Sequence, residues 1–324
     1  MYEGKARAYT NIALIKYWGK KDEALILPMN NSLSLTLDAF YTETAVSFSS
    51  QLQADTFVLD GRLQEEKAVA KVSRFLDLVR QLAGTQLSAR VESTNFVPTA
   101  AGLASSASGM AALAAACNQA LDLNLSDSDL SRLARRGSGS ACRSIFGGFA
   151  EWEQGQDDLT SFARPVASDH FEEELAMLFI LINDKQKDVS SRDGMRQTVA
   201  TSAFYPGWLQ STPEDLAALK AAISAKDFTA LGSVTEANGL KMHATTLAAA
   251  PPFTYWSPQS LTAMDLVRDL RARGTECYFT MDAGPNVKVL CRRSDEAAVK
   301  EAFAAVFSPE QVITAHTGPG IQYL

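Results

Sequence analysis

Residues 98–109, which read PTAAGLASSASG, are almost all small, and the alanine-rich residues 110–116 follow them directly. Small residues allow tight turns and close approach to a ligand, and alanine favours helix. A loop that runs into a helix presents unpaired N–H groups and the positive end of the helix dipole at one point, which suits phosphate. Ser105, Ser106 and Ser108 add hydroxyls for phosphate oxygens or Mg²⁺. The composition also suits plain helix packing, and it matches neither the Walker A nor the GxGxxG pattern.

The segment KYWGKKD, residues 16–22, follows the first expected strand. Lysines at strand ends are mostly solvated. The bulky rings of Tyr17 and Trp18 beside Gly19 nevertheless indicate the wall of a binding site at which the backbone packs closely. Lys20 is then suited to bind a phosphate as a point charge.

Two further loops combine serine with basic residues. Residues 135–144, RRGSGSACRS, contain three arginines with Ser138 and Ser140. They are either a solvated turn or an anion clamp, in which Arg143 would grip phosphate or carboxylate with two hydrogen bonds. Residues 184–195, DKQKDVSSRDGM, follow an apolar run that we expect to be a buried strand. Loops at the ends of central strands are favoured binding positions.

Asp282 lies in MDAGPN, residues 281–286, a tight turn between two expected strands. Aspartate is common in turns for conformational reasons alone. Because two basic loops suit an anionic substrate, we select Asp282 as the general base, kept ionised by a lysine or arginine neighbour. We assign no role to His170, His243 or His316.

Apolar periodicity predicts the elements that position these residues. Thr212 and Pro213, followed by two acids, indicate a helix start. The elements mix without strict strand–helix alternation, so the fold class is α+β, with domains 1–185 and 186–324. We expect strands at 6–16, 32–50, 87–94, 174–182, 277–281, 287–291 and 312–315, and helices at 65–83, 106–121, 126–136, 213–225, 227–243, 258–273 and 295–306.

Composition excludes several classes of protein. The net charge of −7 argues against a general nucleic-acid or membrane-surface binder, so any anionic ligand must be held by a local basic cluster. Four scattered cysteines without a CxxC pair argue against a disulfide framework or a zinc site and fit a cytoplasmic protein. No leader-like or membrane-spanning apolar stretch is visible, so we expect no membrane association.

Taken together, these segments resemble the GHMP kinase superfamily and, within it, the diphosphomevalonate decarboxylase family. The resemblance rests on NIALIKYWGK (11–20), the loop at 98–109, RGSGSACRS (136–144), VSSRDGM (189–195) and MDAGPNVK (281–288). It implies a two-lobed fold with a ribosomal-protein-like first lobe, a ferredoxin-like second lobe and the active site in the cleft. It also implies a homodimer.

The resemblance further implies ATP-dependent decarboxylation of mevalonate 5-diphosphate to isopentenyl diphosphate through transient 3-phosphorylation, with Mg²⁺ and with Asp282 and Lys187 as catalytic residues. Substrate would be bound by Tyr17, Lys20, Ser138, Ser140, Arg143, Ser191, Arg192, Met195 and Ala283. ATP would be bound by Ser93, Asn95, Pro98, Ala101, Gly102, Leu103, Ala104, Ser105, Ser106 and Ser108, and the metal by Ser106.

Two alternatives stay open at the level of the sequence. One is a kinase of the same superfamily acting on mevalonate or its monophosphate, which would make ADP without CO₂. The other is a catalytically silent phosphate- or sugar-binding sensor on the same scaffold. The metal-binding glutamate that such kinases place between the loop and the catalytic aspartate is not identifiable in this sequence.

Overall fold

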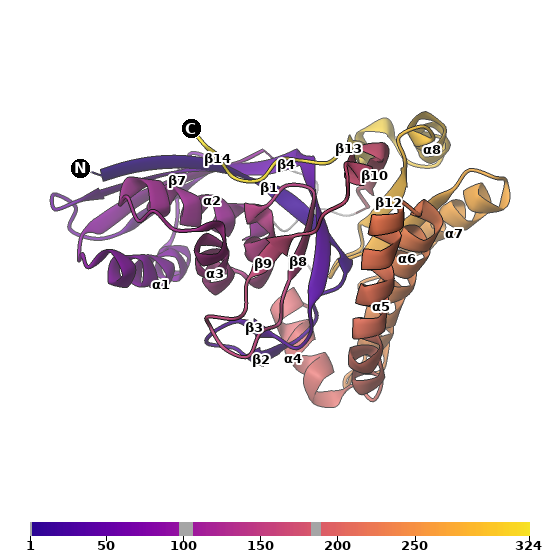
Figure 1. Cartoon of the computed structure of the whole chain (residues 1–324), viewed down its shortest axis with the longest axis horizontal. Helices are drawn as coiled ribbons and strands as arrows, with labels where there is room; N and C mark the ends of the chain where they lie inside the picture. The colour runs from indigo at the N-terminus through magenta and orange to yellow at the C-terminus, as the bar shows by residue number, and fades with distance from the viewer. Residues whose placement is uncertain (1, 97–105, 183–188) are drawn as a thin grey trace.

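The computed structural model describes residues 2–96, 106–182 and 189–324. Within these ranges the chain forms two large β-sheets, each covered by helices (Figure 1). The α+β class predicted from the sequence is confirmed. No helix of the described ranges is long and apolar enough to cross a membrane.

The first sheet is built on two long antiparallel strands, β1 (Tyr2–Ile15) and β4 (Ser32–Ser49), in the order β14-β1-β4-β7-β5-β6. One end of β4 pairs with β7 (Ser88–Phe96) and the other end with β8 (Phe149–Trp152). The chain's last strand pairs with β1, so its end returns to the first sheet. The short strands are β5 (Thr56–Leu59), β6 (Arg62–Leu63), β9 (Ala163–Pro165) and β14 (Gln322–Tyr323).

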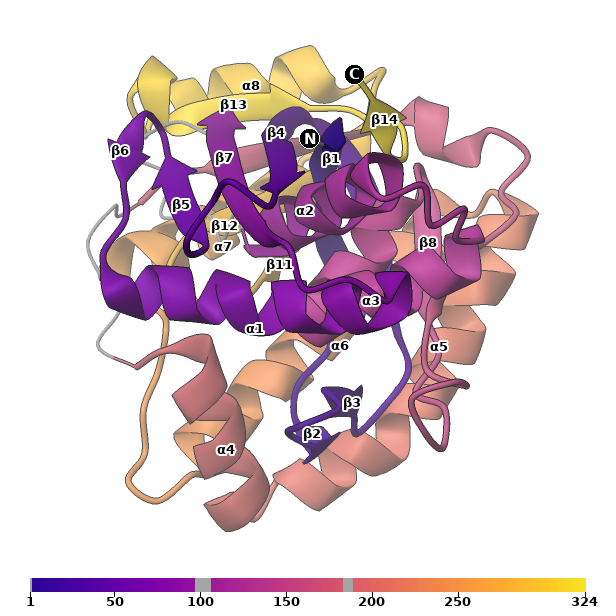
Figure 2. The same ribbon diagram turned by 90° about the vertical axis from the view of Figure 1, so that its left-hand side faces the viewer.

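Three helices form a layer on one face of this sheet: α1 (Glu66–Ala83), α2 (Ser106–Ala120) and α3 (Asp127–Gly137) (Figure 2). The alanines of α2 are buried, and their small side chains let the helix approach the sheet closely. A Cβ atom on Gly4 of β1 would collide with the backbone of α2 at Ala116. This close packing brings the first turn of α2 near the end of β1.

The second sheet is antiparallel, in the order β11-β12-β10-β13. Helices α5 (Tyr205–Ala225) and α6 (Phe228–Leu247) share a core with residues of both sheets, whereas α7 (Pro258–Ala272) and α8 (Glu296–Ala304) cover the opposite face. The strands are β10 (Leu175–Ile180), β11 (Cys277–Met281), β12 (Val287–Arg292) and β13 (Val312–Ala315). The remaining elements are the hairpin β2 (Lys20–Asp22) and β3 (Leu27–Pro28), helix α4 (Ser191–Thr201), and the 3₁₀ segments η1 (Gly139–Ile145), η2 (Phe171–Glu174) and η3 (Pro309–Gln311).

The predicted helix start at Pro213 is wrong, because α5 begins at Tyr205 and contains Pro213. Tyr205 and Trp208 are buried, and their packing extends the helix despite the proline. Helix α4 was not predicted, although Ser190 caps it by accepting a hydrogen bond from the Asp193 N–H at 3.1 Å.

The predicted domain boundary at residue 185 lies outside the described residues. Strand β10 precedes it but pairs with β12 and β13, which follow it. The second sheet therefore contains one strand from before that boundary, β10, and three from after it.

Candidate active site

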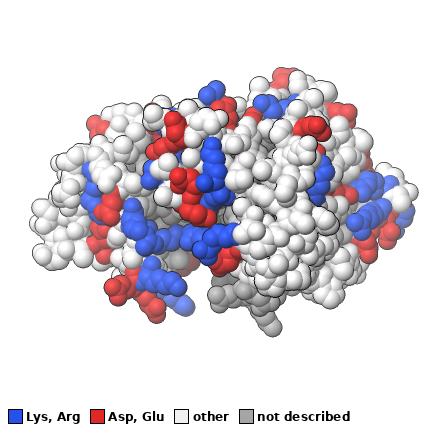
Figure 3. All heavy atoms as spheres, turned by 90° about the horizontal axis from the view of Figure 1, so that it is seen from below, with Lys and Arg blue, Asp and Glu red and all other residues white. Residues whose placement is uncertain are grey.

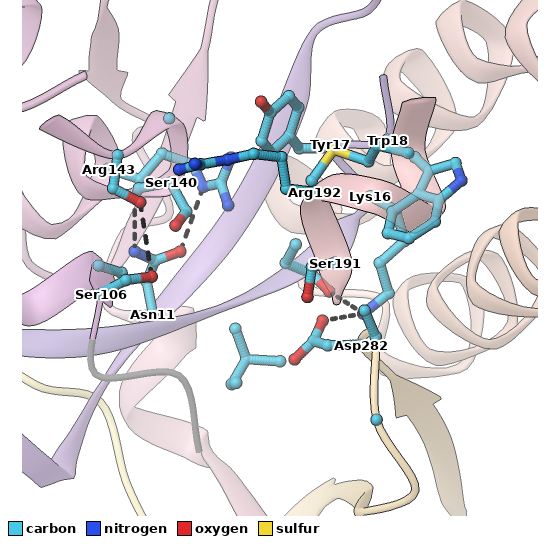
Figure 4. A pocket seen from close by; sticks show the side chains of 18 of the residues that line it. Asn11, Lys16, Tyr17, Trp18, Ser106, Ser140, Arg143, Ser191, Arg192 and Asp282 are labelled. Atoms are coloured by element: carbon cyan, nitrogen blue, oxygen red, sulfur yellow. Dashed lines mark hydrogen bonds and ion pairs between the residues drawn. The ribbon is translucent and has the colours of Figure 1, made fainter. Parts of the chain in front are cut away.

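A pocket of about 280 Å³ lies between the two sheets. Its walls come from the end of β1, the first turn of α2, η1, the start of α4 and the turn between β11 and β12 (Figure 4). Segments far apart in the sequence thus meet at one cavity. Its lining includes Asn11, Lys16, Tyr17, Trp18, Lys20, Ser106, Ser138, Ser140, Arg143, Ser191, Arg192, Met195, Met242, Asp282, Ala283 and Lys288.

Asp282 bridges two buried lysines at one side of this pocket. Its Oδ1 lies 2.8 Å from Lys16 Nζ, and its Oδ2 lies 3.1 Å from Lys288 Nζ. The Lys16 and Lys288 side chains are 3% and 5% exposed, whereas Asp282 is 41% exposed and lines the pocket. Lys16 Nζ also donates to the Ala13 carbonyl at 2.8 Å. The accessible Asp282 carboxylate is therefore held in place by the two buried lysine ammonium groups.

These charges set the ionisation of Asp282. Burial raises the pKa of its carboxyl, but the charges of Lys16 and Lys288 outweigh burial and hold that pKa well below its usual range. Burial lowers the pKa of Lys16, and the Asp282 charge opposes that shift. The basic neighbour expected from the sequence is present. A carboxylate this acidic stays ionised at neutral pH and is a weak proton acceptor.

Arg143, in η1, supplies a buried positive charge on another side of the pocket. Its Nε donates to Asn11 Oδ1 at 3.2 Å and to Ser34 Oγ at 3.0 Å, and its Nη1 donates to Ser32 Oγ. All three acceptors are neutral, and within the described ranges Arg143 forms no ion pair with a carboxylate. A buried guanidinium without a counter-ion favours an anionic ligand.

The other two arginines of this region do not take part in an anion clamp. Arg135 is fully buried and donates to the Asp158 carboxylate and the Leu25 carbonyl. Arg136 donates to the same carboxylate at 3.1 Å. The anion clamp considered from the sequence was built on Arg143 with Ser138 and Ser140, and Asp158, in the connection between β8 and β9, neutralises the other two arginines of that loop. Arg143 alone of the three lines the pocket.

Tyr17 and Lys20 approach the pocket from the segment that follows β1. The Tyr17 hydroxyl is buried and has no hydrogen-bond partner within the described ranges, and its ring packs edge-on against Trp152 at 4.7 Å between centroids. Burial raises the pKa of Tyr17. A buried hydroxyl that lines a pocket without a partner is suited to bond a ligand. Lys20 Nζ lies 2.5 Å from Glu23 Oε2.

Basic side chains gather on one face of the molecule, despite the acidic composition. Figure 3 shows lysines and arginines in a band across the middle of one face. Burial lowers the pKa of Lys71 in α1, and the charges of Arg192 and Arg74 lower it further. Cations from α1 and α4 therefore act on one another, as expected beside a binding site for several phosphates.

Most predicted site residues that fall in the described ranges line the pocket. Those that do so are Tyr17, Lys20, Ser106, Ser138, Ser140, Arg143, Ser191, Arg192, Met195, Asp282 and Ala283. Three do not: Ser93 and Ser108 are buried against Thr44 and Thr42, and Asn95 contacts Asp60 and Thr42. Pro98, Ala101, Gly102, Leu103, Ala104, Ser105 and Lys187 lie outside the described residues.

Sequence reasoning assigned no role to Lys16, Asn11 or Lys288. Lys16 and Asn11 occur in the segment NIALIKYWGK, where we gave roles to Tyr17 and Lys20 only. A lysine directly after a buried strand was a usable signal, because burial of its charge requires a partner. Lys288 gave no such signal, because its place beside Asp282 depends on the pairing of β11 with β12.

The described residues fit a nucleotide-bound magnesium ion rather than a protein cage for a metal. No group of three or more acidic, histidine or cysteine side chains that could hold a metal occurs in the described ranges. Mg²⁺ keeps several waters and binds through few protein oxygens together with substrate phosphates. Ser106, at the first turn of α2, presents one hydroxyl to the pocket, and Asp282 presents a carboxylate.

A pocket with a helix N-terminus, a buried arginine that forms no ion pair within the described ranges, and one ionised carboxylate held by two lysines is typical of an enzyme of phosphoryl transfer to a small anionic substrate. Residues 8–163 match the family model described as the diphosphomevalonate decarboxylase-like N-terminal domain. Residues 177–320 match the mevalonate 5-diphosphate decarboxylase C-terminal domain. The chain belongs to the diphosphomevalonate decarboxylase family, as the resemblance predicted.

Relatives and solved structures agree with this assignment. Diphosphomevalonate decarboxylase from Aspergillus fumigatus is 39% identical, over 95% of this chain and 81% of the relative, and the human enzyme is 37% identical, over 93% and 78%. The solved structure of mevalonate diphosphate decarboxylase from Enterococcus faecalis is 63% identical, with a TM-score of 0.96 and coverage of 100% and 99%. The Staphylococcus aureus enzyme is 57% identical, with a TM-score of 0.98 and coverage of 100% and 98%.

Proposed function

We propose that this chain converts mevalonate 5-diphosphate and ATP to isopentenyl diphosphate, ADP, phosphate and CO₂. The observation that carries the proposal is the Asp282 carboxylate, held between Lys16 and Lys288 at a pocket that is also lined by Arg143, which forms no ion pair with any described carboxylate. A similar structure, 64% identical with a TM-score of 0.97, is described as a complex with MVAPP, AMPPCP and magnesium.

The chemistry explains why ATP is needed. Loss of CO₂ requires an acceptor for the electrons of the breaking C–C bond, and the substrate has no carbonyl placed to receive them. Transfer of the γ-phosphoryl group to the 3-hydroxyl converts a poor leaving group into a good one. The phosphate then departs with the C–O electron pair, and the electrons from the carboxylate's C–C bond form the alkene.

The ionisation of Asp282 indicates how it acts. Because its pKa is held well below the usual range, it is a poor acceptor for a full proton before phosphoryl transfer begins. We propose that it accepts a hydrogen bond from the 3-hydroxyl and aligns that oxygen. The proton passes to the Asp282 carboxylate only as the new P–O bond forms and the bond from the γ-phosphorus to ADP breaks, when the hydroxyl has become strongly acidic. Lys16 and Lys288 hold the carboxylate in place for this.

The remaining roles follow the positions around the pocket. Arg143 and Arg192 bind the diphosphate or carboxylate and restrict the geometry of CO₂ loss. Ser106 would hold a nucleotide-bound magnesium ion, which would neutralise charge at the phosphates. We propose substrate contacts for Tyr17, Lys20, Ser138, Ser140, Ser191, Met195 and Ala283, which line the pocket. ATP contacts for Ser93, Asn95 and Ser108, for Pro98 and residues 101–105, and a catalytic role for Lys187 are proposed from the family resemblance and not from a position around the pocket.

A coupled assay of ADP and CO₂ release on mevalonate 5-diphosphate, with and without Mg²⁺, tests the activity. We expect equal ADP and CO₂ and loss of both on chelation; ADP without CO₂ would indicate a kinase. Asp282→Asn should remove turnover while nucleotide binding persists, and activity within about tenfold of wild type, roughly 1.4 kcal/mol of barrier, contradicts the assigned role. Asp265→Asn, at an exposed ion pair on α7, is the matched control.

A homodimer, a cytoplasmic location and the division into domains 1–185 and 186–324 remain predictions. All four cysteines are buried and free, which fits a reducing compartment. Light scattering after size-exclusion chromatography measures the oligomeric state directly, and a mass near 35.0 kDa would contradict the dimer.

A further inference from the structure

Lys16 lies one residue beyond the end of β1, and side chains from two other segments hold its backbone. Its N–H donates to Asn238 Oδ1 at 2.8 Å. Its carbonyl accepts from Asn30 Nδ2 at 2.8 Å. Asn238 belongs to α6, whereas Lys16 continues a strand of the first sheet. The position of Lys16 therefore depends on a contact between the helical layer of the second sheet and the first sheet.

Asp215 fixes which way the Asn238 amide points. Asn238 is fully buried, and its Nδ2 donates to Asp215 Oδ2 at 2.9 Å. An ionised carboxylate only accepts hydrogen bonds, so it requires the NH₂ group on its own side. The amide oxygen is then left for the Lys16 N–H. Lys241 donates to both Asp215 oxygens, at 2.8 and 2.9 Å, from the exposed side.

Helix α6 also limits the space beside the Lys16 side chain. A Cβ atom on Gly239 would lie 3.8 Å from Lys16 Cε and 3.1 Å from Thr280 Oγ1. The helix therefore packs close to the lysine stem one residue after the amide that binds its backbone. Helix α6 thus restricts the position of both the backbone and the side chain of Lys16.

We propose that Asp215 and Asn238 are positioning residues that hold Lys16 at hydrogen-bond distance from Asp282. Without the Asn238 oxygen, the buried Lys16 N–H loses its acceptor, and the strand end can move to find another. A shift of that kind lengthens the 2.8 Å contact to Asp282 and changes the direction of its carboxylate. This inference rests on the proposed function, because it assigns the ion pair a part in turnover.

Single variants separate positioning from substrate binding. For Asn238→Ala we expect kcat to fall roughly 10- to 100-fold, with KM for both substrates changed less than about threefold, because the geometry of reaction is lost but the binding groups are not. Lys241→Met is the matched control: it removes a cation from the same carboxylate on its exposed side, and we expect kcat within about twofold of wild type.

A residue swap gives a readout that a merely structural role would not produce. In Asn238→Asp two carboxylates face each other, which is unfavourable. In the double variant Asn238→Asp/Asp215→Asn an amide again faces a carboxylate, and a carboxylate oxygen remains for the Lys16 N–H. We expect kcat of the double variant to exceed that of Asn238→Asp by about tenfold. This comparison holds even if Asn238→Ala does not fold.

The outcomes distinguish the two proposals. If the wild-type chain releases no CO₂, the proposed function fails, and the Lys16–Asp282 distance in a crystal structure of the double variant and of Asn238→Asp still tests positioning. Normal wild-type turnover with single variants at wild-type kcat overturns the positioning role alone. A double variant no better than Asn238→Asp, with both folded, overturns it as well.

Discussion

Asp282→Ala should destabilise the protein in a pH-dependent way, because it leaves two buried lysines without their shared counter-ion. After the change Lys16 keeps the Ala13 carbonyl at 2.8 Å, and Lys288 keeps the Asn286 carbonyl at 3.3 Å. Neither acceptor carries a charge that compensates an ammonium group. The folded state then contains two uncompensated cations beside the pocket.

The size of the effect follows from the geometry. Removing one partner of a buried ion pair costs about 3–5 kcal/mol. Because Asp282 is 41% exposed, water in the pocket already screens part of that interaction, so we expect a loss of about 2–3 kcal/mol in the free energy of unfolding at pH 7. Burial, which already lowers the pKa of Lys16, lowers it further once the opposing Asp282 charge is gone.

The sign of the pH dependence is fixed by this shift. A lysine whose pKa is lower in the folded than in the unfolded state binds fewer protons when folded, so stability rises with pH up to the unfolded pKa of about 10.4. Between pH 7 and 9 one lysine contributes at most about 2.7 kcal/mol, and we expect the deficit of Asp282→Ala to shrink by about 1–2 kcal/mol.

Urea unfolding of wild type and Asp282→Ala at pH 7 and pH 9, without nucleotide, measures both quantities. Asp265→Ala, which breaks an exposed pair with Arg268, should stay within about 0.5 kcal/mol of wild type at both pH values. A deficit that is equal at the two pH values, or larger at pH 9, would refute the view that uncompensated lysine charge causes the loss.

Further changes test other parts of the structure. Tyr17→Phe removes a buried hydroxyl that has no hydrogen-bond partner among the described residues, so KM for mevalonate 5-diphosphate should rise about 2- to 10-fold with kcat nearly constant in steady-state kinetics. Asp158→Ala removes the carboxylate that pairs with the buried Arg135 of α3, and it should lower the free energy of unfolding, measured in urea, by about 2–3 kcal/mol. Gly232→Ala places a methyl group inside the Tyr278 ring and should lower the free energy of unfolding, measured in urea, by more than about 2 kcal/mol. Gly207→Ala is the control, because the space around Gly207 is open, and it should leave the free energy of unfolding unchanged or raise it by up to about 1 kcal/mol.

Local signals in the sequence were sufficient for much of the fold. The predicted helix at residues 65–83 is observed as α1, whose buried residues Val72, Phe75, Leu76 and Val79 recur at helical spacing. The part of α5 before Pro213 was missed because burial of Tyr205 and Trp208 extends the helix through that proline. By local sequence alone a proline indicates that a helix starts or ends near it.

The arginines show the same limit for the site. Arg135, Arg136 and Arg143 lie within nine residues in one basic loop, and nothing local separates them. Asp158, which neutralises the first two, belongs to another connection. A charged side chain is available to bind a ligand only if no oppositely charged residue of the same protein pairs with it. Long-range packing decides whether such a residue lies nearby.

The sequence by itself determined which chemical groups are present and the family to which the chain belongs. Asp282, the serine-rich loop and the basic segments were all recognisable from residue types and spacing, because turn, helix-start and anion-binding preferences are local. Only the tertiary structure decided that Asp282 lies between Lys16 and Lys288, and that Asn238 holds Lys16 in place. Those contacts join β1, α6 and the β11–β12 turn, and the electrostatics of the carboxylate arise from this long-range packing.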